Sequence, residues 1–161
     1  MSELVRFEKR GSIGVITVDN PPVNALSPGV PEGMAECVAK GNADPDVKAM
    51  VLIGQGGKFI AGADIKQMGK GNTTPTEWRE TVEMSEKPVV AAIQGYALGG
   101  GLETAMLCNY RIASETAKIG QPEVAIGIIP GAGGTQRVPR LAGVQAALDM
   151  IVGGEHYPSS A

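Results

Sequence analysis

The chain has 161 residues, of which 43% are hydrophobic and 19% charged, and its formal net charge is −3. This length and balance are typical of one globular domain, so we expect residues 1–161 to form a single domain with a substantial core. The small negative charge gives no general reason to bind anionic partners, and we expect neither nucleic acid nor a membrane as partner. The N-terminus lacks the pattern of a signal peptide, which favours a cytoplasmic protein.

Strands and helices alternate along the sequence, which predicts an α/β fold. Short apolar or β-branched runs indicate strands, and stretches of helix-forming residues at helical spacing indicate helices. These patterns predict a hairpin of two strands at 4–10 and 13–18, and further strands at 49–53, 89–93 and 109–113. They predict helices at 28–40, 75–86, 102–107 and 142–152.

Capping residues and prolines indicate where two of these helices begin. Pro28 suits a first helical turn, with Asn24 or Ser27 as the cap. Thr74 and Pro75 suit the start of a later helix in the same way. Both helices are therefore predicted to start next to a proline.

A glycine-rich connection precedes that later helix. Long connections of this kind are uncommon in compact domains unless they have a function. Its centre, residues 61–66, is a candidate source of backbone donors. Composition alone favours a turn that leads into a short helix there.

The most informative stretch runs from the strand at 89–93 through three consecutive glycines, residues 99–101, into a helix. Such a turn directs backbone N–H groups outward and has no Cβ to block a ligand. Glu103 lies in the first turn of this helix among apolar residues, so we expect its carboxyl to be buried. A buried carboxyl is costly unless it is partnered or functional.

A second glutamate, Glu123, follows a Gly-Gln-Pro sequence further along the chain. Local helix geometry cannot join it to Glu103 over that separation, but a return strand through residues 110–112 could bring the two together. Spacing alone leaves this pairing open. Two carboxyls that converge on a donor-rich turn are what acid–base chemistry beside a carbonyl requires.

Other catalytic patterns are not supported. The glycines do not fit the spacing of a dinucleotide fingerprint or a P-loop. The single histidine is His156, and no serine lies in the strained turn that a nucleophilic triad needs. No His, Cys or Asp cluster has metal-ligand spacing, so we expect no metal. Cys37 and Cys108 are too few for a disulfide framework and are expected to be reduced thiols.

Three segments, FIAGADIKQM, GYALGGGLETAM and GQPEVAIGIIPGAGGTQR, resemble the enoyl-CoA hydratase/isomerase (crotonase) family and occur in the family's order. The resemblance extends from Phe7 to Tyr157. It implies repeated strand–strand–helix units wound as a superhelix. Members usually continue into further C-terminal helices that are absent from this chain. The resemblance therefore implies an N-terminal core portion, with a longer multifunctional fatty-acid oxidation protein as one possible origin.

The resemblance also implies roles for individual residues. The family's catalytic glutamates match Glu103 and Glu123, and its oxyanion hole uses the N–H groups at the positions of Ala63 and Gly100. Asp64 is expected to fix the loop or to cap the following turn rather than to transfer protons. The backbone that lies along coenzyme A corresponds to Ala61, Ala63, Asp64, Ile65, Lys66 and Gly100. No cofactor is implied, because coenzyme A is part of the acyl-CoA substrate, and the family's assembly is a trimer.

These implications lead us to expect an enoyl-CoA hydratase of fatty-acid β-oxidation, which adds water syn across the double bond of a 2-enoyl-CoA. Two alternatives stay open: a Δ3-Δ2-enoyl-CoA isomerase, and an incomplete, non-catalytic acyl-CoA-binding fragment of a longer enzyme. The final predicted helix, residues 142–152, is apolar over most of its circumference. It is therefore expected to expose an apolar patch or to self-associate.

Overall fold

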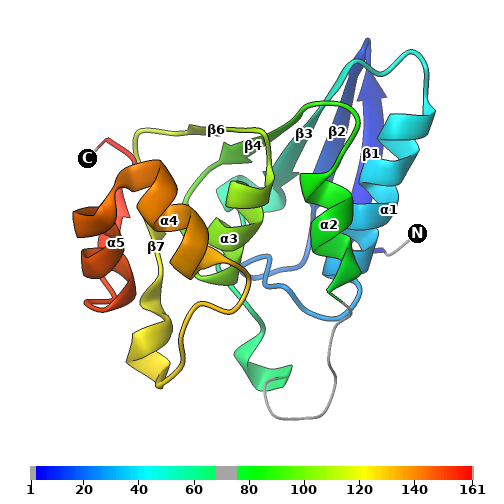
Figure 1. Cartoon of the computed structure of the whole chain (residues 1–161). Helices are drawn as coiled ribbons and strands as arrows, with labels where there is room; N and C mark the ends of the chain where they lie inside the picture. Colours follow the sequence, from blue (N-terminus) through cyan, green and yellow to red (C-terminus); the bar gives the residue numbers. More distant parts are fainter. Residues whose placement is uncertain (1–2, 68–75, 161) are drawn as a thin grey trace.

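The computed structural model describes residues 3–67 and 76–160, which form two β-sheets with helices packed against them (Figure 1). The strands are β1 (Val5–Arg10), β2 (Ile13–Val18), β3 (Ala49–Gly54), β4 (Val89–Ile93), β5 (Tyr96–Leu98), β6 (Tyr110–Ala113), β7 (Lys118–Gly120) and β8 (His156–Pro158). The α-helices are α1 (Val30–Ala43), α2 (Glu77–Glu83), α3 (Gly100–Leu107), α4 (Gly134–Ala142) and α5 (Val144–Ile151). Short 3₁₀ helices are η1 (Gln55–Gly57), η2 (Ile65–Gln67) and η3 (Pro122–Ile126).

The larger sheet has the strand order β1-β2-β3-β4-β6. β1 and β2 form the predicted antiparallel hairpin, and β2, β3, β4 and β6 run parallel to one another. Along β2, β3 and β4 every second residue is buried, which is the period of a strand with one face on the core. That face contributes Ile16, Met50 and Leu52 to a core that also includes Met34 of α1.

The smaller sheet has the order β5-β7-β8, and its middle strand leads into the segment that holds Glu123. β7 pairs in parallel with β5, and the N–H of Gly99 donates to the carbonyl of Gly120 at 2.9 Å. Glu123 follows directly and therefore lies near the N-terminus of α3, which holds Glu103. The strand at residues 110–112 does not supply this route, because β6 pairs with β4 in the larger sheet.

A strand–strand–helix unit recurs along the chain, as the resemblance implies. β1, β2 and α1 form the first unit, β4, β5 and α3 a later one, and β6, β7 and α4 the next. The α/β class and the repetition of this unit are therefore confirmed.

The predicted start of α1 is wrong. The helix begins at Val30 after Gly29, and neither Asn24 nor Ser27 caps it. The side-chain amide of Asn24 instead donates to two backbone carbonyls of a later turn, and the hydroxyl of Ser27 donates to the carboxylate of Asp64. Because these side chains hold other loops in place, they do not serve as caps.

The later helices also differ from the prediction. α2 ends at Glu83, earlier than expected, and its predicted start at Thr74 and Pro75 lies outside the described residues. The helix expected at 142–152 is present as the slightly shorter α5, and the unpredicted α4 precedes it, the two meeting at Gly143, whose φ is +87°. β5, β7, β8 and α4 were not predicted. Strands of three residues have too few side chains to show a period.

The expected apolar patch is present on the last helix. Val144, Leu148 and Val152 are at least half exposed on or beside α5, whereas Ala147 and Met150 on its other side are buried. In the part of the chain that the structure describes, no helix is long and apolar enough to cross a membrane.

Candidate active site

The N-terminus of α3 is built from three glycines. Gly99 has a φ of +51°, a conformation that other residues rarely adopt. Gly101 packs so closely that a Cβ there would lie 1.9 Å from the carbonyl oxygen of Ile60. The turn and the close approach therefore require glycine at these two positions. Gly100 is the first residue of the helix, where no earlier helical carbonyl is placed to accept its N–H.

A second loop brings the backbone of Ala63 to the same place. A Cβ on Gly100 would lie 3.5 Å from the backbone nitrogen of Ala63. The carboxylate of Asp64 holds this loop, because it accepts the hydroxyl of Ser27 at 2.9 Å and the N–H of Lys66 at 3.1 Å. Both contacts are of the kind expected of a residue that fixes the loop. Ala63 and Gly100 therefore border one small space.

Glu103 lies in the first turn of α3 and is only 3% exposed, as predicted. One carboxyl oxygen, Oε1, accepts the N–H of Ala132 at 2.7 Å and the N–H of Gly134 at 2.8 Å. These bonds offset the cost of burying the group and fix its direction. Glu103 is therefore oriented by backbone donors from the loop that leads into α4.

Glu123 lies in η3 and is 8% exposed. The side-chain amide of the buried Gln121 donates to both of its oxygens at 3.1 Å. A Cβ on Gly99 would lie 2.9 Å from Oε1 of Glu123, so the carboxyl reaches the N-terminus of α3. Burial raises the pKa of Glu123, its own backbone N–H opposes that shift, and the nearby charge of Glu103 adds to it. The pairing of the two glutamates, which spacing left open, is present in the fold.

Both glutamates face one cavity of about 410 Å³. Of the predicted site residues, those that line it are Ala61, Ala63, Ile65, Gly100, Glu103 and Glu123. Asp64 and Lys66 are not among its lining residues. The rest of the wall is largely apolar and includes Leu26, Trp78 and Ile128. An apolar wall with a few polar groups at one side suits a ligand that has an apolar chain and one polar reactive group.

Known proteins resemble this chain in sequence and in fold. A family profile described as enoyl-CoA hydratase/isomerase matches residues 8–160. The chain belongs to the enoyl-CoA hydratase/isomerase family. The peroxisomal bifunctional enzyme of Danio rerio is 47% identical over 156 residues, and the probable enoyl-CoA hydratase of Bacillus subtilis is 45% identical over 152 residues. The solved structure of DspI from Pseudomonas aeruginosa superimposes with a TM-score of 0.92 at 35% identity.

These matches cover nearly all of this chain but only part of most relatives. They include 95% of this chain and 22% of the Danio rerio protein, and 89% of this chain and 59% of the Bacillus subtilis protein. For DspI the shares are 99% of this chain and 69% of the other. The crotonase fold of the family is therefore present here, while each relative has further residues outside the match.

Several residues that hold this family's site were missed by sequence reasoning. They are Gln121, which contacts Glu123, and the donors Ala132 and Gly134. A glycine-rich run, residues 131–134, precedes a helix just as residues 99–101 do. The same signal that marked the first donor turn could therefore have found the second.

In residues 3–67 and 76–160, no three His, Cys, Asp or Glu side chains lie close enough together to hold a metal ion.

Proposed function

We propose that this domain adds water to a 2-enoyl-CoA thioester, as an enoyl-CoA hydratase of fatty-acid β-oxidation. The proposal rests on one observation: two buried glutamates and the backbone of Ala63 and Gly100 converge on a single apolar cavity. A conjugated thioester becomes electrophilic at C3 when fixed donors polarise its carbonyl oxygen. The proposed donors are the N–H groups of Ala63 and Gly100. The N-terminal end of α3 adds favourable potential for the enolate oxygen.

The two glutamates take different parts in this reaction. Glu103, held by two backbone N–H groups, orients a water molecule and takes its proton as the oxygen attacks C3. Glu123, whose raised pKa favours the protonated form, gives a proton to C2 as the enolate collapses. One water thus supplies the hydroxyl group, and a proton returned from Glu103 to Glu123 through solvent restores the site.

The loop from Ala61 to Lys66 is proposed to lie along the coenzyme A moiety. Ala61, Ala63 and Ile65 line the cavity, and the two bonds to Asp64 keep this loop in place. The apolar wall would then hold the acyl chain. The proposed reaction needs no further cofactor, because coenzyme A is part of the substrate.

An enoyl-CoA isomerase is the second candidate function. In that reaction one carboxyl carries a proton between C4 and C2 of a 3-enoyl-CoA. The observation that favours it is the raised pKa of Glu123. A group that both takes and gives a proton works best when its pKa lies near the ambient pH, and a raised carboxyl pKa is a shift in that direction.

Two substitutions test the assignment, Glu103→Gln and Glu123→Gln. For a hydratase, each is expected to lower kcat by about 10²–10⁴, with little change in the affinity for the CoA ester. If only Glu123→Gln abolishes turnover of a 3-enoyl-CoA, the isomerase is supported. Full hydration activity in both variants would overturn the assignment.

The activity is proposed for the complete protein, because the chain spans only 22% and 59% of the two relatives described above. A multifunctional fatty-acid oxidation protein is proposed as its context, since one relative is named a bifunctional enzyme. The alternative is a fragment that binds acyl-CoA without converting it. Turnover assays on the 161-residue chain and on the complete protein separate the two.

The trimer and the cytoplasmic location stay predictions. Sedimentation at several concentrations, with and without an acyl-CoA, tests the assembly. Fractionation of the source cells tests the location, for which the relatives named peroxisomal set the competing outcome.

A further inference from the structure

The loop that orients Glu103 is itself held from its other side. The N–H groups of Ala132 and Gly134 donate to Glu103, while the carbonyl of Ala132 accepts Nη1 of Arg137 at 3.2 Å. One peptide segment is thus clamped between a carboxylate and a guanidinium. Neither the sequence patterns nor the family resemblance gave Arg137 a part in the site.

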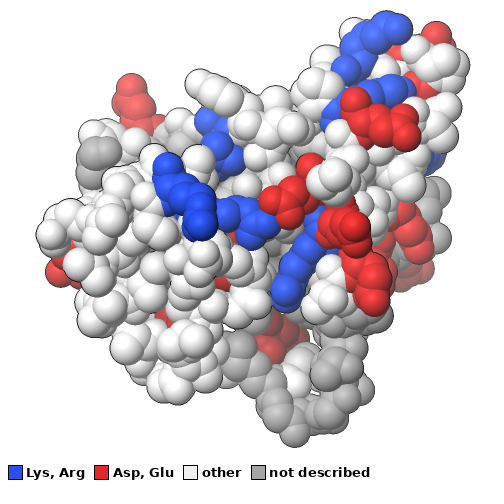
Figure 2. Space-filling model, viewed as in Figure 1, with Lys and Arg blue, Asp and Glu red and all other residues white. Residues whose placement is uncertain are grey.

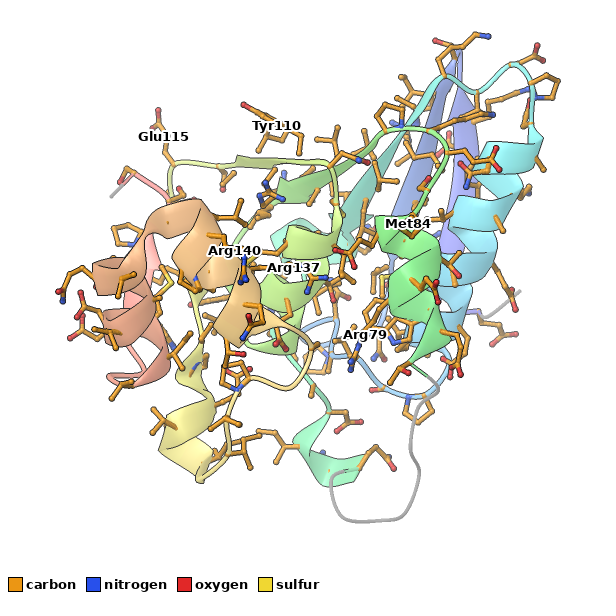
Figure 3. The ribbon with its side chains drawn as sticks, viewed as in Figure 1. Arg79, Met84, Tyr110, Glu115, Arg137 and Arg140 are labelled. Carbon is orange, nitrogen blue, oxygen red and sulfur yellow. The ribbon has the colours of Figure 1, made fainter. Side chains whose placement is uncertain are left out.

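Arg137, which lies in α4, is in turn anchored by Glu83 of α2. Its Nη2 donates to the two carboxyl oxygens of Glu83 at 2.6 and 2.7 Å. Figure 3 shows Arg137 on the side of α4 that faces α2, and Figure 2 shows basic and acidic atoms meeting in the middle of this face. α2 also supplies Trp78 and Arg79 to the cavity wall. The ion pair therefore joins one wall of the cavity to the loop behind Glu103.

The guanidinium also packs directly on the loop. A Cβ on Gly133 would lie 2.0 Å from Nη1 of Arg137, so this arrangement needs a residue without a side chain at that position. The same Nη1 that donates to the carbonyl of Ala132 thus also lies against the next residue of the loop. The loop conformation and the place of Arg137 therefore depend on each other.

We infer that Arg137, anchored by Glu83, is a positioning residue that sets the direction of the Glu103 carboxyl through the 132–134 loop. The pair is partly exposed, with side-chain exposures of 24% for Arg137 and 45% for Glu83, so its direct contribution to stability is small. Its effect falls instead on the two N–H groups that aim the carboxyl. The catalytic consequence rests on the proposed hydration, whereas the effect on the loop does not.

The loop is tested first, without any turnover. The amide resonances of Ala132 and Gly134 are recorded by two-dimensional ¹H–¹⁵N NMR in the 161-residue chain and in Arg137→Gln and Glu83→Gln. An amide that bonds to a carboxylate resonates downfield, so both signals are expected to move upfield in both variants, in the same direction as expected for Glu103→Gln. Unchanged resonances in both variants would overturn the inference, whatever the activity does.

A neighbouring arginine supplies the matched control. Arg140 lies on the same helix (Figure 3), but within residues 3–67 and 76–160 its hydrogen bonds go to the backbone and side chain of Gln136. Arg140→Gln is therefore expected to leave both amide resonances in place. If Arg137→Gln does not fold, Glu83→Gln carries the test alone, because Glu83 is the more exposed partner.

Kinetics of the complete protein then test the catalytic consequence. Misdirecting Glu103 is expected to lower kcat about 10- to 100-fold in Arg137→Gln, with KM changed less than about twofold. The double variant Glu83→Gln/Arg137→Gln is expected to be no slower than Arg137→Gln alone, because the two residues act through one contact. Arg137→Lys keeps a positive charge for Glu83, but an ammonium group lacks the planar fork that contacts Glu83 and Ala132 together. Its kcat is therefore expected to be lowered as in Arg137→Gln.

The outcomes of the two arms are distinguishable. Shifted resonances with a normal kcat would overturn the catalytic part of the inference. A wild-type protein that hydrates no enoyl-CoA would overturn the proposed function, but the amide resonances would still decide the positioning role. Recovery of the wild-type resonances when guanidinium is added to Arg137→Ala would support it directly.

Discussion

Two regions of this molecule are built on different principles. In β2 and β3 of the larger sheet, side chains such as Ile16 and Leu52 are buried at every second position against α1. In residues 121–134, by contrast, the buried groups include Gln121 and Glu123, and the apolar Ile129 is largely exposed. The first region is held by apolar packing and the second by a few polar contacts to backbone. The difference suggests that stability and chemistry can be perturbed separately.

Apart from the substitutions of the two glutamates, the largest expected effect on rate concerns the donor turn between these regions. Gly100→Pro removes one proposed oxyanion donor, and because proline suits the first position of a helix, α3 is expected to form. Loss of such a donor costs on the order of 10²–10³ in rate. Gly100→Ala is the matched control, since it adds the same Cβ, 3.0 Å from the mobile end of Leu26, but keeps the N–H. Steady-state rates and circular dichroism measure both variants, and a folded Gly100→Pro with normal turnover would rule out the donor role.

The next effect should fall on stability alone. Leu52 is 2% exposed in the centre of the larger sheet and does not line the cavity. Leu52→Ala removes buried methyl groups and leaves a cavity, so it is expected to lower the free energy of unfolding by about 2–5 kcal/mol. kcat per folded molecule should not change. Urea unfolding and turnover of the same sample measure the two quantities, and a large loss of kcat in the folded variant would break the separation of the two regions.

The same contrast decides what sequence reasoning could predict. The hairpin at 4–18 was predicted because its first strand alternates polar and apolar residues and its second is rich in β-branched residues, and the strands at 49–53 and 89–93 were predicted because their runs are apolar throughout. β7 was missed because a strand of three residues, paired to a distant strand, has no local signature. The burial of Glu103 followed from its apolar helix. Its partners Ala132 and Gly134 were not predicted, although the glycine-rich run at 131–134 shows the same pattern as residues 99–101.

The roles of the site residues came from the resemblance. The fold shows in addition that these residues lie close together around one cavity. Spacing left the pairing of Glu103 and Glu123 open, because the parallel contact between β5 and β7 that joins them is tertiary. The helix caps failed for a related reason: Asn24 and Ser27 have the right chemistry, but distant loops use it. Polar side chains have several possible partners, and local sequence does not choose among them.

A smaller effect is expected from the charge of Glu123. Because the pKa of Glu123 is raised in the folded state, the folded protein binds this proton more tightly than the unfolded chain does. In acid, below the ordinary glutamate pKa, this carboxyl costs no stability. The cost appears as pH rises from that value through the raised pKa, and it is complete above it. Glu123→Gln removes the cost, so its Tm should exceed that of the wild type at pH 7, and the difference should shrink toward pH 3.

Thermal unfolding at several pH values measures this difference. The exposed Glu115, labelled in Figure 3, supplies a control, and Glu115→Gln should show a much smaller dependence on pH. A Glu123→Gln variant that is less stable than the wild type at neutral pH would show that the contacts of the carboxylate with Gln121 outweigh the cost of its burial.

The smallest effect is expected at the two thiols, one on the helix that covers the larger sheet and one at the end of the helix that holds Glu103. Burial raises the pKa of Cys37 to about 11 and that of Cys108 to about 12. Because the thiolate is the reactive form, neither should react with iodoacetamide in the native protein at pH 8, and both should react in urea. Cys37 lies in α1, whereas Cys108 ends α3, the helix of the candidate site. If the regions unfold together, both thiols become reactive at the same urea concentration, as mass spectrometry of the labelled peptides would show. Earlier labelling of Cys108 would mean that the site opens while the sheet stays folded, and the two regions would then differ in stability as well as in construction.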